Sequence, residues 1–178
     1  MRNILSFTLQ EQPTEPSLCA LPEGYHFAPL DSEEKRLAKL LYDSFKDSLD
    51  DQGESLEEWE TEVASTMTGK YGEILPSLSV NLFHDETLIG TLITSLFRGI
   101  PLILYVAIHP TQQGNGLAKQ LIQQAKEELK KSKQHQELFL VVAAKNIPAY
   151  RLYKTIGFVE RGTNWDELGR HSIKIADK

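Results

Sequence analysis

Cysteine is nearly absent from this chain: Cys19 is the single one among 178 residues. One cysteine cannot form an intramolecular disulfide and has no cysteine partner for a metal site, so a small apolar filler or an exposed thiol is its expected role. Four of the histidines are scattered without metal-ligand spacing, and solvated or satisfied side chains are expected there. They are His26, His84, His135 and His171. We therefore predict no metal.

Long hydrophobic runs are also missing. The longest extends from Ile100 to Ile108 and contains a proline and a tyrosine, whereas a membrane-spanning helix needs about 20 apolar residues. The N-terminus lacks the basic flank, apolar stretch and small-residue cleavage site of a secretory signal. We expect no membrane association and a cytoplasmic location.

Charge is unevenly distributed along the chain. Net charge is −6, and no basic stripe with interleaved aromatics occurs, which argues against nucleic-acid binding. Residues 31–62 contain 12 acidic and 4 basic residues, whereas residues 98–178 contain 13 basic and 7 acidic ones. The two parts should prefer partners of opposite sign. With 40% apolar and 25% charged residues, the composition fits one globular domain.

Hydrophobic periodicity predicts an α/β order of elements. Ile4 to Leu9 fits a short strand within an otherwise aperiodic arm, residues 1–23, that we assign to an N-terminal extension. A capping box of Asp31 and Glu34 opens one helix, and a second follows Ser55. The remaining predicted strands are Gly24–Leu30, Leu78–His84, Thr87–Phe97, Ile100–Ile108 and Leu138–Ala144; helices begin at Leu117 and cover Pro148–Thr155, and a hairpin through His171–Ile175 closes the chain.

A strand, a glycine turn and a helix start follow one another directly between Val106 and Ala118. Unpaired amides in the first turn of a helix, with the helix dipole behind them, bind phosphate oxygens. Gly114 and Gly116 carry no side chain that would keep an anion away from the backbone. The segment predicts a phosphate site, although a plain loop that needs glycine for its turn fits the two glycines equally well.

Two common phosphate motifs are excluded at this turn. A dinucleotide fingerprint needs Gly or Ala where this chain has Lys119, and a P-loop needs Gly-Lys followed by Ser or Thr. Gln113, Gly116 and Ala118 instead fit the pattern Gln/Arg-x-x-Gly-x-Gly/Ala. That pattern is similar to the cofactor motif of GCN5-related N-acetyltransferases, the GNAT family. The preceding Ile108-His109-Pro110 resembles the family's strand exit.

A second motif supports the resemblance. The segment from Asn146 to Phe158 has the pattern Asn-x-x-Ala-x-x-Leu-Tyr-x-x-x-Gly-Phe, which resembles the family's other signature and follows another apolar strand. Specific residues carry the resemblance from Leu104 to Phe158, and the order of elements extends it from Tyr25 to the C-terminus. It implies one GNAT-like α/β domain over residues 24–178, with a mixed, mostly antiparallel sheet flanked by helices and a splayed central strand pair.

The resemblance also implies where acetyl-CoA, the expected co-substrate, would bind. In the family the pantetheine arm enters a gap between two diverging strands, here Ile103–Ile108 and Leu138–Ala144, and one backbone amide, here near Val106, polarises the thioester carbonyl. The implied cofactor contacts are Val106, Ala107, Ile108, Gln113, Gly114, Asn115, Gly116, Leu117, Ala118, Lys119, Asn146 and Tyr153.

Two of these residues have an open choice of role. The Gln113 side chain can bond the phosphate or brace the loop. Asn146 can hold the pantetheine or cap the helix that starts ahead of Pro148, and these two roles are compatible.

Tyr153 is the catalytic residue that the resemblance implies, because a phenol near the sulfur can donate a proton to the departing thiolate. A tyrosine on a short helix commonly just packs, but the surrounding motif favours the catalytic role. The general base of the family has no counterpart here. Many family members carry a glutamate on the strand that corresponds to Leu104–Ile108, and this strand contains no acidic residue. Tyr105 and His109 share a strand face by alternation and could relay a proton, so no base is assigned.

The first two helices and their connection form one wall of the acceptor pocket in the family. Here this wall is acidic, with Asp43, Asp47, Asp50, Asp51, Glu54, Glu57 and Glu58. The acidic wall would attract a cationic amine, whereas a solvated helical face explains the same charges.

The implied function is direct transfer of acetyl from acetyl-CoA to a primary amine, either a small cationic amine or a protein or peptide amine. A noncatalytic acyl-CoA-binding or regulatory module is the alternative; the missing glutamate favours it and Tyr153 counts against it. The acceptor, the acyl length and the choice between monomer and homodimer stay open.

Overall fold

The computed structural model describes residues 1–9, 20–30, 33–166 and 168. Cys19, Asp31 and the expected hairpin at His171–Ile175 lie outside these residues. The strands are β1 (Arg2–Thr8), β2 (Tyr25–Pro29), β3 (Glu73–Ile74), β4 (Val80–His84), β5 (Thr87–Phe97), β6 (Ile100–Ile108), β7 (Glu137–Ala143) and β8 (Val159–Gly162). In the described chain they form one 8-stranded sheet in the order β2-β4-β5-β6-β7-β1-β8, with β3 paired to β5.

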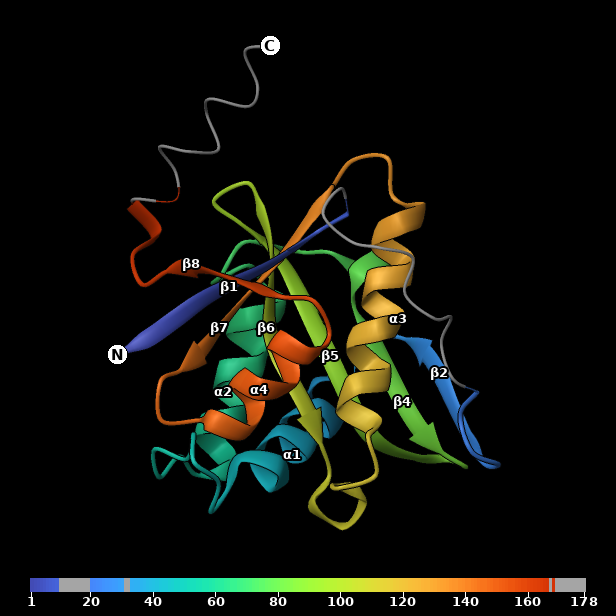
Figure 1. Ribbon diagram of the computed structural model, residues 1–178. Helices are drawn as coiled ribbons and strands as arrows, with labels where there is room; N and C mark the ends of the chain where they lie inside the picture. Colours follow the sequence, from blue (N-terminus) through green and yellow to red (C-terminus); the bar gives the residue numbers. More distant parts are fainter. Residues whose placement is uncertain (10–19, 31–32, 167, 169–178) are drawn as a thin grey trace.

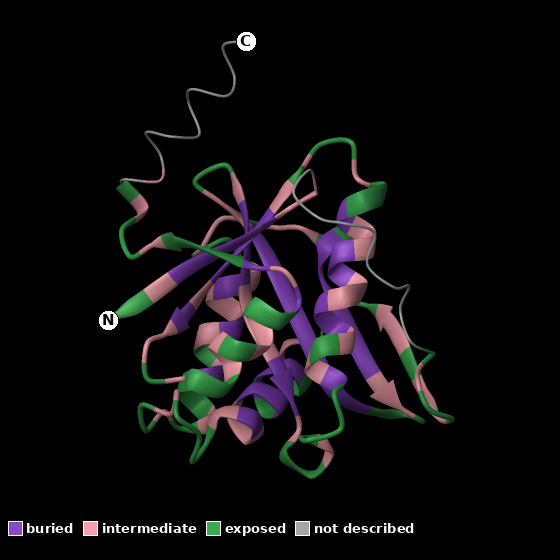
Figure 2. Ribbon diagram, in the orientation of Figure 1, coloured by how far each residue is buried: buried purple, intermediate pink, exposed green. Residues whose placement is uncertain are grey.

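Helices cover both faces of this sheet (Figure 1). They are α1 (Glu34–Phe45), α2 (Leu56–Met67), α3 (Leu117–Lys131) and α4 (Ile147–Thr155), with short 3-10 helices at Pro76–Leu78 and Pro110–Gln112. Ala107 packs in the cluster formed with α1 and α2, whereas its neighbour Ile108 packs in the cluster beneath α3. Successive strand residues face opposite sides, so α3 covers one face and α1 and α2 cover the other. Figure 2 shows that the central strands between these layers are the most deeply buried.

The antiparallel succession of β4, β5 and β6 is confirmed, and the bounds of β5 and β6 match the predicted strands. The predicted strand from Leu78 begins later, at Val80, because Pro76–Leu78 turns as a 3-10 helix. A proline at the start of such a turn fixes φ and removes a ladder donor. The helix after Ser55 is also confirmed, with a capping box between Ser55 and Glu58. Helix α1 has Glu33 at its N-cap and no side-chain cap bond within the described chain.

The assignment of residues 1–23 to an extension needs a correction for their first strand. β1 lies inside the sheet, antiparallel to both β7 and β8. Ile4, Leu5 and Phe7 are each at most 2% exposed. Alternation predicted this strand but could not place it, because its partners lie far away in sequence. Residues Arg2–Thr8 therefore belong to the domain's sheet.

The central strands β6 and β7 diverge, as predicted. Their parallel pairing is limited to Leu102 with Phe139 and Ile103 with Leu140. On the other side of β6, the register to β5 shifts so that Leu104 has no opposite residue. A bulge of this kind bends the strand and increases its twist. The end of β6, from Val106 to Ile108, is consequently free of a β7 partner.

A buried lysine fixes α4 against the rest of the fold. Lys126 of α3 is 1% exposed, and its Nζ donates to the carbonyl oxygen of Ile156, at the end of α4, over 2.8 Å. The same Nζ lies 4.2 Å from the ring centroid of Phe7 in β1, a cation–π distance. Lys126 therefore joins α3, α4 and β1, and holds in place the helix that carries Asn146 and Tyr153.

Candidate active site

The turn between β6 and α3 has the geometry of an anion site. Gly114 and Gly116 have φ of 80° and 74°, in the left-handed region that favours glycine. Gly116 is the N-cap residue of α3, and within the described chain no side chain caps that helix. A Cβ built on either glycine would meet no atom within 4 Å, so the space in front of the first helical amides is open. Such amides, together with the helix dipole, favour a phosphate.

Side chains brace this turn from within. The Nε2 atom of Gln113 donates to the carbonyl oxygen of Ile108 over 2.9 Å, which is the bracing role of this residue. The Asn115 side chain donates to the carbonyl of Gln112, and Tyr25 of β2 donates its hydroxyl proton to the Gln112 side chain. The turn is therefore held in shape by contacts of the chain itself.

A cleft of about 290 Å³ lies where β6 leaves β7. It brings together the end of β6, the start of the glycine turn, the start of α4 and the connection between α1 and α2. Its lining residues are Ser44, Phe45, Ser48, Leu49, Asp50, Val106, Ala107, Ile108, Gln113, Asn146 and Pro148. Five of these are predicted cofactor contacts. The others of that set, from Gly114 to Lys119, follow Gln113 directly into α3, apart from Tyr153 on α4.

Asn146 links the two walls of this cleft. Its Oδ1 accepts from the backbone amide of Ala149 over 3.2 Å, so it caps α4 as one of its two predicted roles. Its Nδ2 donates to Oδ2 of Asp50 over 2.6 Å. The connection between α1 and α2 therefore meets the start of α4 across the cleft.

Tyr153 lies on α4, partly buried and outside the cleft lining, with its ring centroid 6.0 Å from that of Phe158. Burial raises the pKa of its phenol to about 12, and the Asp50 carboxylate adds to the shift. The phenol is consequently neutral near pH 7, the form in which it can donate a proton.

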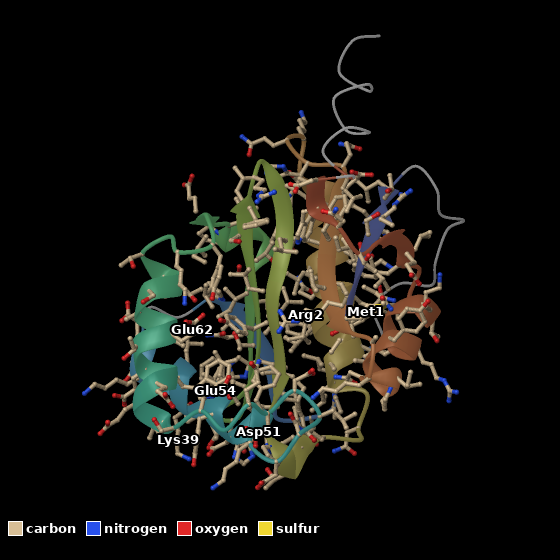
Figure 3. All side chains as sticks on the ribbon, turned by 90° about the vertical axis from the view of Figure 1, so that its left-hand side faces the viewer. Met1, Arg2, Lys39, Asp51, Glu54 and Glu62 are labelled. Carbon is tan, nitrogen blue, oxygen red and sulfur yellow. The ribbon has the colours of Figure 1, made fainter. Side chains whose placement is uncertain are left out.

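A network between α2 and β6 was not anticipated from the sequence. Glu62 of α2 accepts hydrogen bonds from Tyr71 over 2.6 Å, from Tyr105 of β6 over 3.1 Å and from Lys70 over 2.5 Å. Burial alone would raise the pKa of Glu62, but these donors outweigh it and lower the pKa. Figure 3 labels Glu62 on α2, with Asp51 and Glu54 on the connection that precedes this helix. Glu62 follows the buried Trp59 by three residues, and residues with this spacing share one face of a helix. This spacing is the sequence signal that places Glu62 on the inner face of α2.

Neither proton-relay candidate of the sequence analysis lines the cleft. Tyr105 points toward Glu62, and burial raises its pKa well above the usual range. His109 lines a separate hollow of about 520 Å³ together with Asp43, Arg36 and Lys39. Its Nδ1 lies 2.8 Å from the Thr111 hydroxyl and its Nε2 3.8 Å from the Asp43 carboxylate.

A family model described as the acetyltransferase (GNAT) family matches residues 35–158, which include both glycine-turn and α4 motifs. The chain belongs to the GNAT family. The family is described as one of acetyltransferases. No curated protein matches the sequence significantly.

Solved structures share the GNAT fold with this chain. A GCN5-related N-acetyltransferase from Sphaerobacter thermophilus has 20% identity and a TM-score of 0.67, over 90% of this chain and 48% of that one. The ribosomal-protein-S18-alanine N-acetyltransferase of Escherichia coli has 21% identity and a TM-score of 0.60, over 77% and 79%. The PaiA N-acetyltransferase of Thermoplasma acidophilum, in complex with coenzyme A, has 18% identity and a TM-score of 0.58, over 79% of this chain and 93% of that one. This chain thus spans about half the length of the Sphaerobacter protein.

Among the residues that the structure describes, no helix is long and apolar enough to cross a membrane. Within the same residues, no group of His, Cys, Asp and Glu side chains could hold a metal ion.

Proposed function

We propose that this GNAT protein is an N-acetyltransferase in which a primary amine attacks the thioester of acetyl-CoA directly. The cleft carries the proposal, because it joins the unpaired end of β6, the braced glycine turn and the start of α4 in one place. Direct attack needs only that the amine and the thioester meet in such a cleft, with donors placed for the developing oxyanion.

In the proposed complex, the pyrophosphate lies on the amides from Gly114 to Ala118, with Lys119 adding positive charge. The pantetheine runs beside Ala107, Ile108 and Asn146. The amide near Val106 donates to the carbonyl oxygen as negative charge develops there. Tyr153 gives its proton to the leaving thiolate, and its pKa, raised to about 12, keeps the phenol protonated at neutral pH until then.

The proposed acceptor is a small cationic amine or a protein or peptide amine. The acidic connection between α1 and α2 forms part of the cleft through Asp50, and its negative charge would favour a protonated amine. One structural neighbour is named a ribosomal-protein-S18-alanine N-acetyltransferase, so alanine-containing peptides belong among the acceptors to be tested.

Thiol release from acetyl-CoA tests the proposal across polyamines, aminoglycosides, amino acids and peptides, with calorimetric titration of acetyl-CoA in parallel. Acceptor-dependent release supports the transferase and identifies its substrate class. Binding of acetyl-CoA without thiol release for any acceptor favours a noncatalytic acyl-CoA-binding module. The missing strand glutamate also supports this alternative hypothesis. Absence of binding contradicts the assigned cofactor site.

A further inference from the structure

The attacking amine must lose a proton, and β6 offers no carboxylate to take it. A free alkylamine has a pKa of about 10 and is mostly protonated at neutral pH. Residues Ile100–Ile108 contain no acidic side chain, and Tyr105 and His109 both lie outside the cleft. The proton acceptor therefore has to come from another element.

Two carboxylates approach β6 from the helical layer, and they differ in how far they are already satisfied. Glu62 accepts from Lys70, Tyr71 and Tyr105, and these donors lower its pKa, which makes it a weak base. It also does not line the cleft. Glu62 is thus an anchor between α2 and β6.

Asp50 differs from Glu62 in its position and in its hydrogen bonds. It lines the same cleft as Val106, Ala107 and Ile108, where the thioester is proposed to lie. Asn146 donates to its Oδ2 over 2.6 Å, which fixes the orientation of the carboxylate, and among the described contacts no hydrogen bond reaches its Oδ1. One oxygen is consequently available to a ligand in the cleft.

We infer that Asp50 is the catalytic residue that binds the acceptor amine and takes its proton, in place of the carboxylate that β6 lacks. This inference rests on the proposed function and adds to it the group on which the acceptor's nitrogen is held.

The reaction balances with this assignment. Asp50 takes one proton from the bound ammonium, and the freed nitrogen lone pair forms the N–C bond while the carbonyl electron pair moves to oxygen. The nitrogen of the tetrahedral intermediate then gives its second proton to solvent. The oxygen electron pair re-forms the carbonyl, the C–S bond breaks, and the thiolate receives a proton from Tyr153. Afterwards Asp50 returns its proton to solvent and Tyr153 regains one, so one proton is released per ammonium acetylated.

The environment of the pair favours these two roles. Burial raises the pKa of Tyr153, and the charge of Asp50 raises it further, so the phenol holds the proton that a general acid must carry before it donates. Tyr153 on α4 is close enough for the Asp50 charge to act on its pKa. β6 and the end of α1 contribute only Val106–Ile108, Ser44 and Phe45 to the cleft, none of which titrates.

The test is Asp50→Asn, which keeps an oxygen that can accept from Asn146 and removes the base. With putrescine, ethylamine and an alanine tripeptide as probes, kcat/KM should fall by about 100-fold at pH 7. The deficit should shrink as the pH approaches about 10, because solvent then deprotonates the amine. Acetyl-CoA affinity and melting temperature should stay near those of wild type, and Asp50→Glu should recover part of the rate.

Glu60→Gln is the matched control. Glu60 lies on α2 outside the cleft lining, and its substitution removes one negative charge, as Asp50→Asn does. Equal rates for wild type and Asp50→Asn at pH 7 overturn the inference alone. A loss that does not change with pH also overturns it, because a structural role gives a constant deficit. Wild type that releases no thiol with any probe contradicts the proposed function, and the inference falls with it.

Discussion

At the scale of single residues, protonation decides what Tyr153 can do. Its pKa is raised to about 12, so the phenol keeps its proton across the neutral and mildly alkaline range. The sign for stability follows from the same shift. A raised pKa in the folded state contributes stability that is complete below the unfolded value of about 10 and is lost as the pH rises through about 12.

Tyr153→Phe tests the acid role. The variant keeps the ring that packs beside Phe158 and removes the proton that the thiolate would receive. We expect kcat to fall by about 100-fold while acetyl-CoA affinity, measured by calorimetry, stays nearly unchanged. Tyr150→Phe, on the same helix with its hydroxyl bonded to Glu160, is the control. Equal kcat in Tyr153→Phe and wild type would remove Tyr153 from the mechanism.

Gly116 tests the pyrophosphate site. Gly116→Val places a branched side chain in the open space before the helical amides, and acetyl-CoA affinity should fall at least about tenfold. Gly99→Val is a matched control, since Gly99 also has a positive φ, 79°, and open space around it. Both variants should lose similar stability, roughly 1–2 kcal/mol, from the left-handed backbone. Unchanged affinity in Gly116→Val would refute the assignment of this turn.

At the scale of elements, the shape of the cleft depends on the hydrogen bonds that hold α2 and α4 in position. Glu62 ties α2 to β6 through Tyr105, and Lys126 ties the end of α4 to α3 and β1. The two polar contacts lie on opposite faces of the sheet, one with α2 and the other with α3. A hydrophobic core alone would position these helices less specifically than directed bonds do.

Glu62→Gln should destabilise the protein by roughly 1–3 kcal/mol at pH 7, because the partly buried hydroxyls of Tyr71 and Tyr105, and Lys70, lose their ionised partner. The lowered pKa of Glu62 gives a stability contribution present above the unfolded value of about 4.3 and lost as the pH falls through the folded value. Urea denaturation should therefore show a difference from wild type that narrows below about pH 4. With Glu60→Gln as control, a difference independent of pH would contradict this account.

The sequence could predict most elements and the glycine turn before α3, but not the pairing of distant parts. Periodicity located β5, β6 and α3, because their apolar patterns are long and end at clear signals such as Pro110. It could not place β1 between β7 and β8, since strand order depends on partners more than a hundred residues apart. For the same reason, Asp50 beside Asn146 and Glu62 beside Tyr105 appear only in the folded chain.

At the scale of the whole molecule, charge is divided between two parts of the chain. The acidic part, residues 31–62, includes the proposed acceptor side of the cleft, and the basic part, residues 98–178, includes α3 and the glycine turn that is proposed to bind the pyrophosphate. A cationic acceptor and an anionic cofactor would thus approach different surfaces.

Salt should weaken both approaches. Raising NaCl from about 20 mM to about 200 mM shortens the range of electrostatic attraction to roughly 7 Å, so KM should rise several-fold for a cationic acceptor and for acetyl-CoA. kcat should change little, because contacts inside the cleft are short. Initial rates at both salt concentrations measure this. A KM for the cationic acceptor that is insensitive to salt would indicate that the acidic wall is only a solvated face.

The most direct test of the account follows the acetyl group itself. Wild-type protein is incubated with acetyl-CoA labelled in the acetyl group and with the amine that gives most thiol release, and the label is traced by chromatography. The account predicts label in the N-acetylated amine in equal amount to the free CoA thiol. Label that stays in acetyl-CoA, or appears as free acetate, would contradict it.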